Sequence, residues 1–79
     1  MAAEGRLVWR CRRGMRELDA LLTRYLTTHY PGADAVERQA FESTLDLTDP
    51  EIWAFVLGQA VPSDPAMRYV IEQIAHPGA

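Results

Sequence analysis

The stretch MRELDALLTRYLTTHYPG, residues 15–32, decides the fold of this chain. Its apolar residues recur every three or four positions, which is the spacing of one face of an α-helix. These residues are Met15, Leu18, Leu21, Leu22, Tyr25, Leu26 and Tyr30. Pro31 and Gly32 then break the pattern, because proline cannot continue a helix. We therefore predict an amphipathic helix that begins near Met15 and ends before Pro31.

Three aspartates mark the starts of three further helices. Asp34 is followed three residues later by Glu37, as in a capping box. Asp49 and Asp64 each precede a proline, which suits a first helical turn, while the aspartate accepts unpaired amide hydrogens. We expect these helices to run to about Asp46, to about Leu57 and to just before His76.

The helix that starts at Asp49 is apolar on nearly all sides. Its apolar residues are Ile52, Trp53, Phe55, Val56 and Leu57. Such a helix either lies centrally in the fold or presents part of its surface to a partner. The pattern does not decide whether Trp53 lies in the core or at a partner interface.

The whole chain is predicted to be all-α. Residues 7–9 fit one or two turns of an additional helix that Gly14 would interrupt. There is no alternating strand pattern and no internal repeat. We therefore expect a compact bundle of four to five short helices in a single domain, residues 1–79, with residues 1–5 and 76–79 flexible.

Composition restricts the class of protein. A chain of 79 residues, 48% of them hydrophobic, can build one core and is too apolar to be disordered. Its single cysteine, Cys11, allows no intramolecular disulfide, so stability must come from packing and the compartment is expected to be reducing. Without a secretory signal pattern or a long apolar run, the expected location is the cytoplasm, without membrane insertion.

Charge is distributed unevenly along the chain. All eight basic residues are arginines, and five of them, Arg6, Arg10, Arg12, Arg13 and Arg16, lie in the first 16 residues. The rest of the chain is mainly acidic, and the net charge of −3 argues against a general nucleic-acid-binding protein. Such a dipolar molecule can orient itself against a charged partner.

The arginines before Gly14 have two interpretations. Arg10, Arg12 and Arg13 fit the last turn of a first helix, where cations are favourable, with Gly14 past its end. The same arginines also precede the next helix, whose N-terminus is destabilised by about 0.3–1 kcal/mol for each cation in its first turn. Residues that are unfavourable for local helix stability often have a functional role. Gly14 would let another backbone approach beside Arg13 and Glu17, so the second interpretation is a docking surface.

Few residues offer catalytic or metal-binding chemistry. His29 and His76 are not at metal-ligand spacing from each other or from Cys11, and no glycine-rich phosphate loop is present. Neighbouring arginines would favour a reactive thiolate at Cys11, but a lone cysteine is more often a small buried apolar residue. We therefore expect no metal site and no enzyme activity.

Residues 9–19, WRCRRGMRELD, resemble the same region of the bacterial succinate dehydrogenase FAD assembly factors. Within them, RGMRE at residues 13–17 matches the RGxxE signature of that family. The resemblance extends to the helix start at Asp49-Pro50, the aromatic-rich helix at residues 52–57 and the turn at Pro62. It covers most of the chain, and members of this family are small helical proteins, some of them described as antitoxin-like.

The resemblance implies an assembly factor that promotes covalent attachment of FAD to a histidine of the flavoprotein subunit of succinate dehydrogenase, or of the related fumarate reductase. The factor would hold the domains of the flavoprotein in a favourable geometry, and FAD would remain the partner's cofactor without stable binding to the factor. Glu17 would pair with a donor of the partner or fix Arg13. The implied partner-binding residues are Arg6, Arg12, Arg13, Gly14, Arg16 and Glu17.

A different class of protein is the alternative. An antitoxin-like or regulatory protein would bind a partner or a nucleic acid through the arginine cluster. Phosphate binding by several arginines would weaken steeply with salt and would not require Glu17, so a carboxylate within the cluster argues against it. We expect a protein that binds a flavoprotein but no nucleic acid, and a monomer rather than a dimer.

Overall fold

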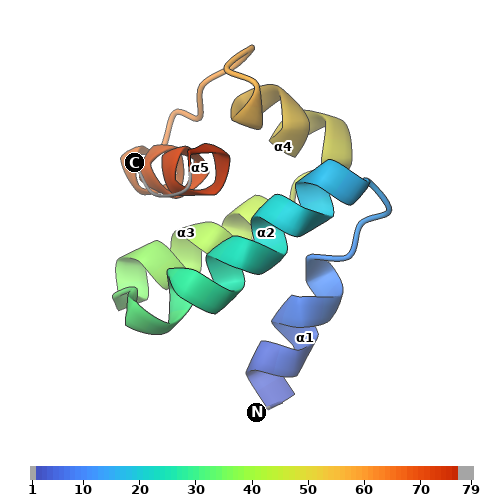
Figure 1. Cartoon of the computed structure of the whole chain (residues 1–79). Helices are drawn as coiled ribbons and strands as arrows, with labels where there is room; N and C mark the ends of the chain where they lie inside the picture. The colour runs from blue at the N-terminus through green and yellow to red at the C-terminus, as the bar shows by residue number, and fades with distance from the viewer. Residues whose placement is uncertain (1, 77–79) are drawn as a thin grey trace.

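The chain folds into a bundle of short helices (Figure 1). The computed structural model describes the backbone of residues 2–76 and the side chains of residues 5–76. Over these residues the elements are α1 (Ala2–Arg10), α2 (Arg16–Thr28), the 3-10 turn η1 (Tyr30–Gly32), α3 (Ala35–Leu45), α4 (Asp49–Val56) and α5 (Pro65–Ala75). The described residues form no strand, so the predicted all-α class is confirmed.

Helices α2 and α3 form an antiparallel pair joined by η1 (Figure 1). The rings of Tyr25 and Phe41 meet between them with centroids 4.6 Å apart, and both side chains are almost fully buried. The Tyr25 hydroxyl donates a hydrogen bond of 2.5 Å to Glu37. Burial and then this hydrogen bond raise the pKa of Tyr25, so the hydroxyl stays a neutral donor. Pro31 lies in η1, which explains why α2 ends at Thr28.

Helix α5 completes the core by packing against α2, α3 and α4. Its buried residues Val70, Ile71 and Ile74 follow the three- and four-residue spacing of one helical face. Helix α4 contributes Ile52, which is fully buried, while Trp53 is half-buried and packs against the same core. The ambiguous apolar helix therefore lies against the bundle.

Capping explains where α3 and α5 begin. The Asp34 side chain accepts a hydrogen bond from the Glu37 amide at 2.9 Å, and the Asp64 side chain accepts one from the Met67 amide at 3.0 Å. Both predicted starts are confirmed. The capping box at Asp34 is incomplete, because the Glu37 carboxylate binds the Tyr25 hydroxyl.

The predicted cap of α4 is wrong by one residue. Thr48, and not Asp49, is the N-cap, and it forms a reciprocal capping box with Glu51. Threonine is a good N-cap because its short hydroxyl reaches the free amides of the first turn. Asp49 is the first residue of α4, and its carboxylate is left for another contact.

Helix α1 is longer than the one or two turns expected around residues 7–9, since it begins at Ala2. Its contacts are mainly with α2, and it adds Leu7 to the core. Flexibility of residues 1–5 and 76–79 stays a prediction, and Met1 and residues 77–79 lie outside the described residues. Among the described residues, no helix has the length and apolar character needed to cross a membrane.

The packing of α4 gives a first testable prediction. Ile52→Val removes one methyl group from a fully buried site and should lower the free energy of unfolding by about 0.5–1.5 kcal/mol. Val61→Ala, at a side chain that is 67% exposed, is the control and should change it by less than about 0.5 kcal/mol. Urea unfolding followed by circular dichroism measures both. Equal effects would contradict a core position for Ile52.

Candidate functional site

The Arg13 side chain points into the molecule. Its guanidinium forms an ion pair with Asp49 and donates hydrogen bonds to the carbonyl oxygens of Leu45, at 2.9 Å, and Leu47, at 2.5 Å. The Arg13 side chain is only 16% exposed. Arg13 therefore joins the loop between α1 and α2 to the corner between α3 and α4.

Arg10 adds a second contact to the same corner. It pairs with Asp46 and donates a longer hydrogen bond of 3.4 Å to the carbonyl oxygen of Glu42. Arg10 lies in the last turn of α1, where a cation is favourable, as the helix-end interpretation predicted. Arg12 and Arg13, in contrast, lie beyond the helix.

Gly14 has a backbone conformation that other residues rarely adopt. Its φ is +92°, in the left-handed region that favours glycine. The Asp19 carboxylate accepts hydrogen bonds from the amides of Arg13, at 2.8 Å, and Gly14, at 3.1 Å. This carboxylate holds the loop from the side of α2. Gly14 itself is exposed, and apart from its two neighbours in the chain no atom lies within 4 Å of the position that a Cβ would occupy.

The structure separates the residues of the RGxxE stretch. Within the described residues, Arg13 pairs with Asp49 and not with Glu17, so the interpretation of Glu17 as the residue that fixes Arg13 is wrong. The physical reason is that the nitrogen donors of Arg13 are already bonded to Asp49 and to two carbonyl oxygens. Glu17 and Arg16 are exposed at the start of α2. A role for Arg13 at a partner interface stays a prediction.

The other predicted arginines lie on the surface. Arg6 on α1 and Arg12 in the following loop are both exposed. The Arg12 guanidinium lies over the ring of Trp9, 5.6 Å from its centroid, in a cation–π contact. Trp9 is 71% exposed, which is unusual for a tryptophan. An exposed aromatic ring beside an arginine that has no ion pair is typical of residues that contribute strongly to binding.

Cys11 belongs to the core. Its side chain is fully buried, and burial raises the pKa of the thiol to about 11, although the positive charge of Arg13 opposes this effect. The thiol is therefore neutral near pH 7. The reactive interpretation of Cys11 is wrong, and its burial as a small apolar residue is confirmed.

Sequence reasoning missed Asp19, Trp9 and the pairing role of Asp49. Asp19 was visible only as a carboxylate in the first turns of a helix, and its bonds to two loop amides depend on the turn at Gly14. Asp49 is 36 residues from Arg13, so no local pattern connects them. Trp9 fitted the apolar spacing of a short helix and gave no sign of its exposure.

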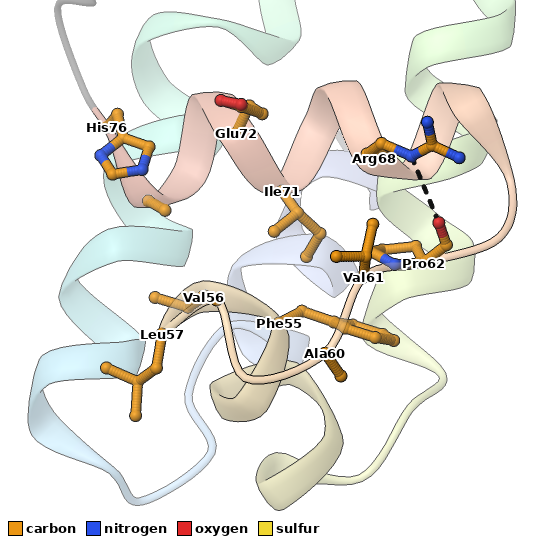
Figure 2. Close-up of a pocket in the computed structure, with 12 residues that line it drawn as sticks. Phe55, Val56, Leu57, Ala60, Val61, Pro62, Arg68, Ile71, Glu72 and His76 are labelled. Atoms are coloured by element: carbon orange, nitrogen blue, oxygen red, sulfur yellow. Dashed lines mark hydrogen bonds between the residues drawn. The ribbon is translucent and has the colours of Figure 1, made fainter.

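A hollow lies at the C-terminal end of α4 (Figure 2). It has a volume of about 370 Å³ and is lined mainly by apolar residues of α4, of the loop that follows it and of α5. At its rim, Arg68 donates a hydrogen bond of 3.3 Å to the carbonyl oxygen of Pro62. In the part of the chain that the structure describes, no group of three histidine, cysteine or carboxylate side chains is placed to hold a metal ion.

Comparison with known proteins gives consistent results. Residues 5–77 match the model of a family described as "Flavinator of succinate dehydrogenase". The chain is 52% identical over 67 residues to the FAD assembly factor SdhE of Methylococcus capsulatus, which covers 85% of this chain and 81% of the relative. It is 41% identical over 69 residues to SdhE of Xylella fastidiosa, covering 87% and 71% of the two chains. For SdhE of Pseudomonas aeruginosa the identity is 35% over 69 residues, covering 87% and 82%.

The family description and the names of these relatives mention neither a toxin nor a nucleic acid. The alternative of an antitoxin-like or regulatory nucleic-acid-binding protein therefore receives no support.

The buried contacts of Arg13 predict a structural cost for its removal. Arg13→Ala leaves Asp49 and two carbonyl oxygens without their donor and should lower the free energy of unfolding by about 1.5–3 kcal/mol. Arg16→Ala removes the same type of side chain from an exposed site and should change it by less than about 0.5 kcal/mol. Urea unfolding compares the two variants, and equal stabilities would show that the Arg13 contacts contribute little.

The Cys11 environment predicts a protected thiol. A rise of the pKa from 9.0 to about 11 lowers the thiolate fraction at pH 8 by roughly 100-fold, and burial slows the reaction further. The folded protein should therefore react with a thiol-specific disulfide reagent more than 100-fold more slowly than the urea-unfolded chain. Absorbance of the released thiolate measures both rates, and similar rates would contradict burial of Cys11.

Proposed function

We propose, since the chain belongs to the family of succinate dehydrogenase flavinators, that it is an assembly factor that binds the flavoprotein subunit of succinate dehydrogenase and promotes covalent attachment of FAD. The observation that carries the proposal is the RGxxE stretch at residues 13–17. Gly14 is exposed on a loop held from two sides, and Glu17 is exposed in the first turn of α2, which follows that loop. A loop fixed in this way presents a defined surface to a partner with little loss of conformational entropy on binding.

The proposed mechanism is positioning. The one cysteine of the factor is buried and offers no accessible thiol, and its sequence contains no glycine-rich phosphate loop. FAD therefore remains the substrate and then the cofactor of the flavoprotein. A rigid surface can accelerate an attachment reaction by holding the reacting groups of its partner in alignment, since alignment removes much of the entropic barrier.

Each residue of the exposed surface has a separate contribution in this proposal. Gly14 lets the partner's backbone approach, because no side chain occupies the open space beside it. The Glu17 carboxylate accepts hydrogen bonds from donors of the partner, and the exposed Arg6, Arg12 and Arg16 bind its acceptors. Arg13 does not face the partner in this proposal. It fixes the loop to the bundle through its hydrogen bonds to the α3–α4 corner.

The proposal also covers a second client protein, the oligomeric state and the cellular location. The related fumarate reductase flavoprotein is a second client, because it carries the same kind of covalent flavin. We propose that the factor acts as a monomer in the cytoplasm. The monomer is supported by α4, whose Ile52 and Trp53 pack onto the core of the same chain.

A matched pair of substitutions tests the proposed function. Glu17→Gln removes the exposed negative charge of Glu17 and with it the proposed charge-assisted hydrogen bond to the partner. Such a bond contributes about 1.5–3 kcal/mol, and its loss corresponds to at least tenfold weaker binding. We expect covalent flavinylation of the apo-flavoprotein, with limiting factor and added FAD, to slow by about tenfold. Glu72→Gln makes the same chemical change at an exposed position on α5 and should leave the rate unchanged.

In-gel flavin fluorescence of the denatured flavoprotein measures the covalent product, and circular dichroism verifies that both variants are folded. Equal rates for Glu17→Gln and Glu72→Gln would remove Glu17 from the interface. If the unchanged factor fails to accelerate flavinylation at all, the proposed function itself is wrong.

A further inference from the structure

The arginines of this chain fall into two groups. Four of the eight are bonded within the chain: Arg10 and Arg13 to carboxylates, and Arg38 and Arg68 to carbonyl oxygens of neighbouring loops. The other four are Arg6, Arg12, Arg16 and Arg24. Among the described residues, none of these four side chains forms an ion pair or a hydrogen bond. Among the described residues, the arginines without such a partner are therefore confined to α1, α2 and the loop between them.

Two of the unpaired arginines border a shallow groove that begins at Gly14. Arg12 and Arg24 line this groove together with Ala20, Thr23 and Thr27 of α2. Positions 20, 23, 24 and 27 share one face of a helix, and the small side chain of Ala20 leaves the hollow open. The groove thus continues from the exposed loop along the surface of α2.

The charge of the groove is positive. Its one acidic lining residue, Asp19, uses both carboxylate oxygens to accept hydrogen bonds from the amides of Arg13 and Gly14. Those bonds reduce the negative potential that Asp19 presents to a ligand. Arg12 and Arg24 have no such compensation, so the groove favours carboxylates or other anions.

The Arg12–Arg24 groove also offers polar groups beside its arginines. The Thr23 hydroxyl has no hydrogen-bond partner among the described residues, whereas the Thr27 hydroxyl donates to the Thr23 carbonyl oxygen at 2.9 Å. From Asp19 to Thr27 the helix rises roughly 12 Å, at about 1.5 Å per residue. About four residues of extended chain span that distance.

We propose that the Arg12–Arg24 groove binds a short acidic segment of the flavoprotein, next to the contact made by Gly14 and Glu17. This inference rests on the proposed function and names the chemistry of the partner at that surface. Arg12 and Arg24 bind carboxylates of the segment, and Thr23 donates a hydrogen bond to it. The net charge of −3 and the exposed Glu17 disfavour a polyanion such as a nucleic acid, which would extend beyond the groove.

The sharpest test fills the groove without harming the helix. Ala20→Glu places a carboxylate in it, and glutamate four residues before Arg24 is the favourable order for a helical ion pair, so α2 keeps its stability. We expect affinity for the purified flavoprotein subunit, measured by isothermal titration calorimetry, to fall by about tenfold or more. Gln39→Glu produces the same change of net charge at an exposed position on α3 and should bind within twofold of the unchanged chain.

Arg24→Gln gives an independent readout. Removing one cation from the contact should weaken binding and also reduce its dependence on salt concentration, because fewer charges then face the partner. If Ala20→Glu and Arg24→Gln both bind as tightly as Gln39→Glu, the groove does not bind the flavoprotein.

The two proposals fail in different ways. Normal binding by Ala20→Glu together with slowed flavinylation by Glu17→Gln would overturn the groove and keep the assembly function. No binding of the flavoprotein by the unchanged chain would overturn both. Binding of a single-stranded oligonucleotide that Ala20→Glu abolishes would assign the groove to nucleic acid instead, and would also overturn the inference.

Discussion

The guanidinium of Arg13 is the contact on which the arrangement of this small bundle depends. It reaches from the loop before α2 to Asp49 and to the carbonyl oxygens of Leu45 and Leu47, so it joins segments more than 30 residues apart in sequence. Removing a charged group from water is costly unless its hydrogen-bonding capacity is satisfied. Here one carboxylate and two carbonyl oxygens satisfy it. A planar group with donors in fixed directions suits this task, which a lysine could not perform in the same way.

The same contact explains the uneven charge of the chain. Asp46 and Asp49 lie at the α3–α4 corner, where they neutralise Arg10 and Arg13. The two internal pairs leave the remaining N-terminal arginines without partners, and these lie on the surface of α1, α2 and their connecting loop. The protein is acidic overall but has a basic surface, because some of its arginines form ion pairs within the chain and the others face solvent. Such a surface directs encounter with a partner of opposite charge more than it adds affinity.

The sequence predicted the helices well because their signals are local. The spacing of apolar residues in α2 and the caps at Asp34 and Asp64 act within one or two turns, and the structure confirms them. The candidate site was less predictable, because the partners of Arg13 are distant in sequence and the choice between Glu17 and Asp49 depends on tertiary packing. The cap at Thr48 was missed for a related reason. Asp49 and Thr48 are both good caps, and Asp49 is engaged by Arg13 instead.

The RGxxE stretch combines three different physical roles within five residues. Arg13 is largely buried and fixes the loop to the bundle, Gly14 allows the left-handed turn that the loop requires, and Glu17 remains in solvent. A motif with this division of roles can be lost either by unfolding of the loop or by loss of a partner contact, so inactivity of a variant alone cannot separate the two. Stability and binding must therefore be measured on the same variants. A domain of 79 residues that carries no reactive group at its surface loop can still promote a reaction on its partner, provided that this loop is rigid enough to orient the partner.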